Sequence, residues 1–111
     1  MSPAVQAVAV VVAVGYAVVN AFGSWAVARR RASIGGAFFA AASFLIVGAV
    51  AVAFGLPGAL PLVTVGVVTA SLTSWWNARA VLRRVVPWRH ALRAAAGLVV
   101  VALTLWAVGA R

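Results

Sequence analysis

The sequence predicts an all-α integral membrane protein in which four transmembrane helices form one bundle, and three observations lead to this fold class. Hydrophobic residues make up 67% of the 111 residues and only 8% are charged, whereas about a quarter of the residues in soluble globular proteins are charged. The apolar residues fall into four long segments. The arginines are concentrated between these segments, which is typical of loops that stay on one side of a membrane.

Four segments have the length that a bilayer requires, at about residues 4–28, 34–56, 60–80 and 90–110. A membrane-crossing helix needs roughly 20 mainly apolar residues, because a rise of about 1.5 Å per residue must cover about 30 Å of hydrocarbon. We therefore expect residues 1–111 to form a single transmembrane domain. No basic stretch precedes the first segment, so we interpret it as a retained span rather than a cleaved signal peptide.

The three connections between the spans differ in charge. Glycine and proline break the helix at 55–61 without any charged residue, which predicts a tight turn. The connections at 29–33 and 79–93 carry eight of the nine arginines. Because basic loops are retained in the cytoplasm, we expect both basic connections on the cytoplasmic side of the cell membrane and both termini outside. The residue usage is typical of a bacterial protein, which would make this the inner membrane.

A short pattern occurs twice at the predicted cytoplasmic boundary. Ser-Trp-x-x-Ala-Arg ends the first span at 24–29 and the third span at 74–79. Two interpretations remain open: the chain consists of two tandem helix hairpins, or both helix ends meet the same physical demand. In the second case the tryptophan ring lies at the headgroup level while the arginine, four residues later on the same face, reaches the lipid phosphates.

Polar side chains within the spans form two stripes at four-residue intervals. They are Tyr16, Asn20 and Ser24 in the first span, and Thr69, Thr73 and Asn77 in the third. The two stripes can face each other across a bundle. Either they hydrogen-bond one helix to another, each bond contributing about 1 kcal/mol or less, or they line a path or pocket for a solute.

The arginines have no carboxylate side chain to pair with, because the sequence contains no aspartate or glutamate. Their counter-charges must come from lipid phosphates, from solvent ions or from another protein. We expect anionic lipid headgroups and either a membrane-protein partner or self-association. We expect no nucleic-acid partner, since the arginines lie between apolar spans and no soluble domain presents a groove for it. The candidate residues for binding lipid or a partner are Arg29, Arg30, Arg31, Arg79, Arg83, Arg84, Arg89 and Arg93, with Trp25, Trp75 and Trp88.

The residue types needed for most chemistry are missing. The sequence has no cysteine and no carboxylate side chain, and its single histidine, His90, follows Trp88 and Arg89 at the predicted headgroup level. Enzymes generally place a metal ligand set, a carboxylate, a thiol or a histidine beside a nucleophile. We therefore expect no enzyme, no catalytic residue, no cofactor and no metal site.

Two main functions follow from this reading of the residues, and a third is a membrane-permeabilising protein of the phage type, since such proteins are also short, basic and multi-span. The first is a non-catalytic structural or accessory subunit, or an assembly factor, of a larger membrane complex. The alternative is a minimal homo-oligomeric channel or small-solute transporter lined by the two polar stripes. The sequence alone does not identify a solute or a partner.

Overall fold

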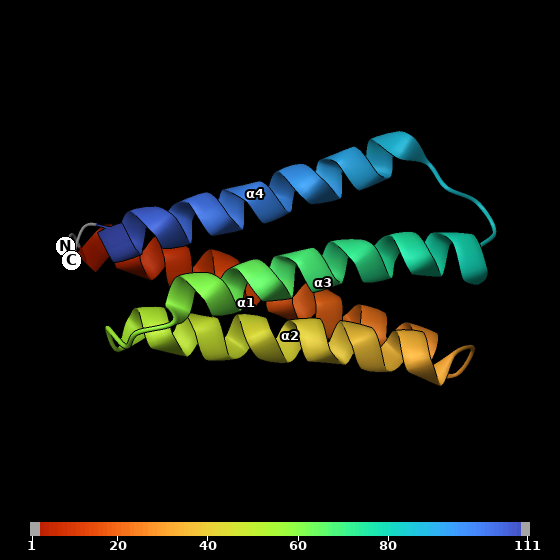
Figure 1. Ribbon diagram of the computed structural model, residues 1–111, viewed down its shortest axis with the longest axis horizontal. Helices are drawn as coiled ribbons and strands as arrows, with labels where there is room; N and C mark the ends of the chain where they lie inside the picture. The colour runs from red at the N-terminus through yellow and green to blue at the C-terminus, as the bar shows by residue number, and fades with distance from the viewer. Residues whose placement is uncertain (1–2, 110–111) are drawn as a thin grey trace.

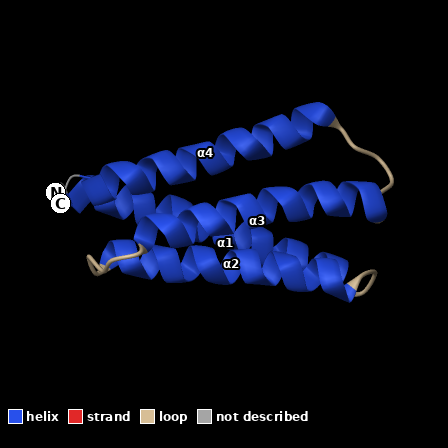
Figure 2. Ribbon diagram, viewed as in Figure 1, coloured by secondary structure: helices blue, strands red, loops and turns tan. Residues whose placement is uncertain are grey.

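The computed structural model describes residues 3–109. They form four α-helices joined by three connections: α1 (Pro3–Ala28), α2 (Ala32–Ala53), α3 (Ala59–Ala80) and α4 (Pro87–Gly109). Figure 2 shows helices and loops throughout this part of the chain and no strand. Each helix is long and apolar enough to cross a membrane. The predicted fold class, a bundle of four transmembrane helices, is confirmed.

The helix bounds follow the predicted spans closely, apart from the basic connection between α3 and α4. This connection is limited to residues 81–86, so Arg79, Arg89 and Arg93 lie on helices rather than in the loop expected at 79–93. α4 begins at Pro87 because the first helical position needs no backbone N–H donor and suits the fixed φ of proline. The predicted end of this span at residue 110 lies outside the described residues.

The turn between α2 and α3 depends on two glycines. Gly55 and Gly58 have φ angles of 66° and 86°, in the left-handed region that glycine adopts without a steric penalty. The backbone N–H of Leu56 donates to the carbonyl of Ala51 over 2.8 Å and thereby ends α2. These conformations produce the tight uncharged turn that the sequence predicts at 55–61.

The four helices form a closed ring in which each is a neighbour of two others. Consecutive helices pack against each other, and α4 packs against α1, so α1 and α3 lie on a diagonal. Figure 1 shows both ends of the chain at one end of the bundle and the connections after α1 and α3 at the other. The long axis extends 45 Å, which matches the thickness of a bilayer including its headgroups.

Small residues make up much of the interior of the bundle, and many large apolar side chains face outward. Ala9, Ala13 and Ala17 form the buried face of α1, whereas Val11 and Phe22 on the same helix are 69% and 67% exposed. The outward faces are thus far more apolar than the surface of a soluble protein. This arrangement suits a lipid environment, where close helix packing rather than removal of apolar surface from water stabilises the bundle.

Glycines let the helix backbones approach closely at two levels. A Cβ atom at Gly48 of α2 would lie 2.6 Å from Cγ2 of Val63 on α3, and one at Gly97 of α4 would lie 2.5 Å from Cγ1 of Val67. α4 is thus held tightly against α3 near Gly97. From there toward Pro87, α4 leans away from α3 (Figure 1).

Candidate functional site

Eight arginines gather at the end of the bundle where α1 joins α2 and α3 joins α4. Arg29, Arg30 and Arg31 lie at the first connection. The other five lie at the end of α3, in the connection 81–86 and in the first two turns of α4. The ninth arginine, Arg111, lies outside the described residues. We refer to this part of the molecule as the arginine-rich end.

Three of these arginines lie over tryptophan rings. The guanidinium carbon of Arg79 is 4.9 Å from the centroid of the Trp75 ring, and Arg89 lies 5.6 Å from that of Trp88. Arg31 lies 5.7 Å from the centroid of the Trp76 ring, and this contact joins the first connection to α3. Each contact is worth about 0.5–1 kcal/mol at an exposed site. The rings cover part of each guanidinium but leave its charge without a counter-ion.

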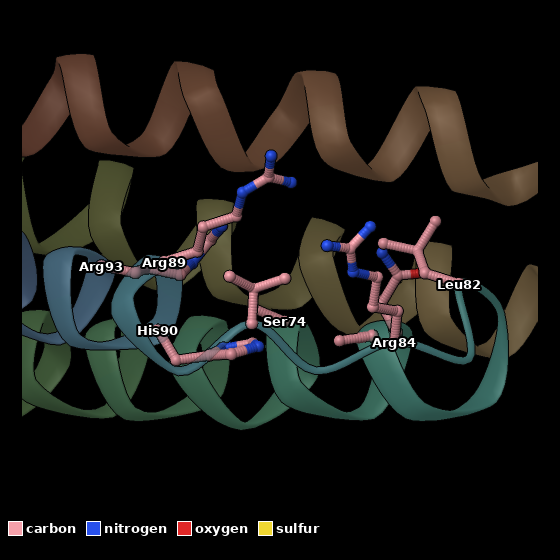
Figure 3. Close-up of a pocket in the computed structure, with 9 residues that line it drawn as sticks. Ser74, Leu82, Arg84, Arg89, His90 and Arg93 are labelled. Carbon is pink, nitrogen blue, oxygen red and sulfur yellow. The ribbon is translucent and has the colours of Figure 1, made fainter.

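A cavity of about 190 Å³ lies at the arginine-rich end, where α4 leans away from α3. Its walls come from the last turns of α3, from the connection and from the first turns of α4. Figure 3 shows Arg84 and Arg89 on either side of Ser74, with His90 and Arg93 on the α4 side. The lining residues are Ser74, Asn77, Ala78, Leu82, Arg84, Val86, Arg89, His90 and Arg93.

Backbone hydrogen bonds fold the connection back over the end of α3 and so bring Arg84 to the cavity. The backbone N–H of Leu82 donates to the carbonyl of Asn77 over 3.1 Å, and that of Arg84 donates to the carbonyl of Ala78 over 2.9 Å. Arg83 between them has a φ of 52°, a left-handed conformation that costs about 1–2 kcal/mol for a residue with a Cβ. The two carbonyls at the end of α3 are thereby satisfied.

Arg93 joins the cavity to the interior of the bundle. Its Nη2 donates a hydrogen bond of 2.7 Å to Oδ1 of Asn20 on α1, and the Asn20 side chain is fully buried. Asn20 in turn donates from Nδ2 to the backbone carbonyl of Tyr16 over 2.8 Å. The guanidinium of Arg93 also lies 5.6 Å from the centroid of the Phe38 ring of α2. Because the Asn20 amide is uncharged, this hydrogen bond leaves the positive charge of Arg93 without a counter-charge.

Three buried polar atoms have no hydrogen-bond partner among residues 3–109. They are Oη of Tyr16, Oδ1 of Asn77 and Nε of Arg93. Two of these residues, Asn77 and Arg93, line the cavity. A buried polar atom without a partner costs about 1–3 kcal/mol, so the cavity suits an occupant that brings hydrogen-bonding groups.

The other predicted stripe residues are distributed over separate contacts. Ser24 Oγ donates to the carbonyl of Gly35 on α2 over 2.8 Å, while Thr73 Oγ1 donates to the carbonyl of Thr69 on its own helix over 2.6 Å. The stripe of α1 meets α4 at Arg93 rather than the stripe of α3, because α1 and α3 lie on a diagonal. Asn77 is brought to the cavity, and Trp25 is exposed to the surroundings.

Two polar contacts were not foreseen from the sequence. The Gln6 side chain on α1 donates to the carbonyls of Val52 and Ala53 at the end of α2, over 2.8 and 2.9 Å. Arg93 pairs with Asn20 from within a helix. Gln6 and Arg93 could have been singled out as polar residues with apolar neighbours in the sequence. The sequence does not indicate which helix either side chain contacts.

The comparisons with known proteins found no similarity: no protein-family model, no curated protein and no solved structure matches this chain. Its class follows from the fold, which is that of a multi-pass membrane protein with four apolar helices. Within that class, the particular features of this chain are its arginine-rich end and the arginine-lined cavity between α3 and α4.

Proposed function

We propose that the protein is a non-catalytic subunit or assembly factor of a larger membrane complex and binds an acidic membrane protein at its arginine-rich end. The proposal rests on one observation: eight arginines lie at one end of the helix bundle, and the sequence contains no aspartate or glutamate. Arg29, Arg30, Arg79 and Arg83 are exposed there and do not line the cavity. A partner with exposed carboxylates would supply the missing counter-charges and would be steered to this surface.

The same arginines indicate the orientation that goes with this proposal. Basic connections resist export, so the arginine-rich end lies in the cytoplasm and both termini lie outside the bacterial inner membrane. The partner therefore presents its acidic residues at the cytoplasmic headgroup level.

The packing of the interior favours a subunit over a channel. Ala13, Ala17 and Leu45 are buried in the middle of the bundle, together with Val63 and Val100. The Arg93–Asn20 hydrogen bond crosses from α4 to α1 at one end of this packed region. A solute path along Asn20 would have to break this bond and leave the guanidinium unpaired, at a cost of several kcal/mol.

The test is to purify the protein from its native membrane in mild detergent and to identify everything that remains bound. We expect an acidic membrane protein in fixed ratio, and we expect Arg29→Glu with Arg30→Glu to release it. Arg29→Lys with Arg30→Lys is the matched control, because it keeps both charges and should keep the partner. Recovery of the protein alone, or as a homo-oligomer with lipid only, would overturn the proposal.

A further inference from the structure

We propose that the cavity between α3 and α4 is a binding site for a phosphate group, supplied in the membrane by the headgroup of an anionic phospholipid. This inference does not rest on the proposed partner, because it concerns Arg84, Arg89 and Arg93, which line the cavity, rather than the arginines around it, which do not.

The charge around the cavity favours a doubly or singly charged anion. Three guanidinium groups line a space of about 190 Å³, and the sequence contains no carboxylate side chain to neutralise them. Arg89 and Arg93 are four residues apart on α4 and therefore share one face of the helix, while Arg84 comes from the connection. The amino end of α4, with the positive end of its helix dipole, lies at the same place.

The shape of this donor set favours phosphate over carboxylate. Arginine binds phosphate oxygens through two parallel N–H groups. A carboxylate offers acceptors in one plane, whereas donors from two chain segments approach the cavity from different sides (Figure 3). A tetrahedral phosphate presents oxygens in several directions and can meet both segments.

The unpartnered atoms at the cavity are suited to the same ligand. Nε of Arg93 is a buried donor with no partner among the described residues, and its Nη2 is already held by Asn20. Oδ1 of Asn77 is a buried acceptor without a partner among the described residues; the phosphate oxygens cannot donate to it, but a hydroxyl of the headgroup can. At about 30 Å³ for each water molecule, the cavity has room for about six water-sized groups, so a phosphate fits together with part of the group that carries it.

The depth of the cavity points to a lipid rather than a soluble phosphate. Trp75 and Trp88 are exposed at the same end of the bundle, and indole rings settle at the level of the headgroups. The side chains of Leu82, Val86 and Ala78 line the cavity beside the arginines. A wall that combines cationic and apolar groups between two helices suits a phospholipid, whose phosphate and glycerol region are amphipathic.

The experiment uses the whole protein, purified and freed of lipid in a neutral detergent, with no partner present. Binding of phosphatidylglycerol, phosphatidylcholine and inorganic phosphate is measured by native mass spectrometry and by the shift of the thermal unfolding midpoint. The cavity variant is Arg84→Gln with Arg89→Gln. The matched control is Arg29→Gln with Arg30→Gln, which removes the same charge from the same end without changing a lining residue.

We expect one saturable site for phosphatidylglycerol, with an affinity that falls about tenfold or more in the cavity variant, because hydrogen bonds to charged groups are lost. The control should stay within about twofold of the unchanged protein. If inorganic phosphate binds as tightly as the lipid and displaces it, phosphate recognition is supported and the source is soluble. Equal losses of lipid affinity in the cavity variant and the control would overturn the proposal, since the lipid would then be attracted by the total charge of the arginine-rich end rather than bound in the cavity.

Two further results keep the test decisive. Helical content and elution volume of the cavity variant should match the unchanged protein, and Arg84→Lys with Arg89→Lys should lose part of the affinity because lysine lacks the guanidinium fork. If the cavity variant binds lipid normally but no longer retains an acidic protein from the native membrane, the cavity is a protein contact and the lipid proposal fails. If the cavity variant loses lipid binding but retains the acidic partner, the lipid site is supported and is distinct from the partner surface.

Discussion

Nη2 of Arg93 on α4 lies 2.7 Å from Oδ1 of Asn20 on α1, although 73 residues separate them in the chain. This hydrogen bond closes the ring of helices between the first and the last. It also brings a charged group to a buried amide in an interior made mainly of apolar residues. The pair therefore has consequences for stability, for any path through the bundle and for the cavity beside it.

Replacing Asn20 by leucine should destabilise the bundle by roughly 2–4 kcal/mol, because the guanidinium of Arg93 would face an apolar side chain and lose its charge-assisted hydrogen bond. The free energy of unfolding in detergent measures the effect. Thr104→Val is the control: Thr104 is also fully buried, but its Oγ1 donates to the carbonyl of Val100 on its own helix over 2.9 Å. We expect a loss below about 1 kcal/mol there, and similar losses in the two variants would contradict the special role of Arg93.

Asn20→Asp should have the opposite effect. A carboxylate at this position would neutralise the Arg93 guanidinium at hydrogen-bonding distance, and a buried pair with good geometry offsets much of its desolvation cost. We expect the variant to be at least as stable as the unchanged protein at neutral pH and less stable when the carboxylate is protonated in acid. Unfolding measured at both pH values checks this, and a destabilised variant at neutral pH would refute it.

Gly97→Ala should weaken the contact between α3 and α4 by about 1–3 kcal/mol, because the new Cβ would lie 2.5 Å from Cγ1 of Val67. Adding Val67→Ala removes that atom and should restore part of the loss, so the two changes should be coupled in a double-mutant cycle. Gly15→Ala is the control, since nothing lies within 4 Å of a Cβ atom there. Additive effects of Gly97→Ala and Val67→Ala would mean that the two helices do not meet at this point.

Gln6→Leu should destabilise the protein by about 1–2 kcal/mol by leaving the carbonyls of Val52 and Ala53 without the Gln6 amide. Leucine keeps a similar size and is apolar, so a loss would report on the hydrogen bonds rather than on the volume. Hydrogen exchange of the last turn of α2 should increase in the same variant. Unchanged exchange in that turn would show that the Gln6 contact does not hold the end of α2.

The orientation can be tested with a reporter fused after Arg111. Because eight arginines lie at the opposite end of the bundle, we expect the fusion to be active outside the cytoplasm. A second fusion between Arg83 and Arg84 should be active only inside. A C-terminal reporter that works only in the cytoplasm would reverse the proposed orientation and with it the place of the cavity.

The sequence by itself determined the number of spans, their approximate ends and the end of the bundle at which the arginines gather. These features depend on local quantities: the length of an apolar segment, the turn conformations of Gly55 and Gly58, and the position of charges between spans. The local signals also include Pro87, whose ring cannot continue one helix but suits the first turn of the next, and α4 begins there.

The polar stripes indicated the inward faces of α1 and α3, where Asn20 and Thr73 are buried, but only the tertiary structure decided which helices are neighbours and which faces of α2 and α4 point inward. In a soluble protein the periodicity of apolar residues carries this information, but here the faces toward lipid and toward the core are both apolar, so it is lost. Val11 is exposed and Ala13 is buried on the same helix, although both are apolar. The pairing of Asn20 with Arg93, the separation of the two polar stripes and the cavity between α3 and α4 all follow from the packing of small residues between helices, which no single segment encodes.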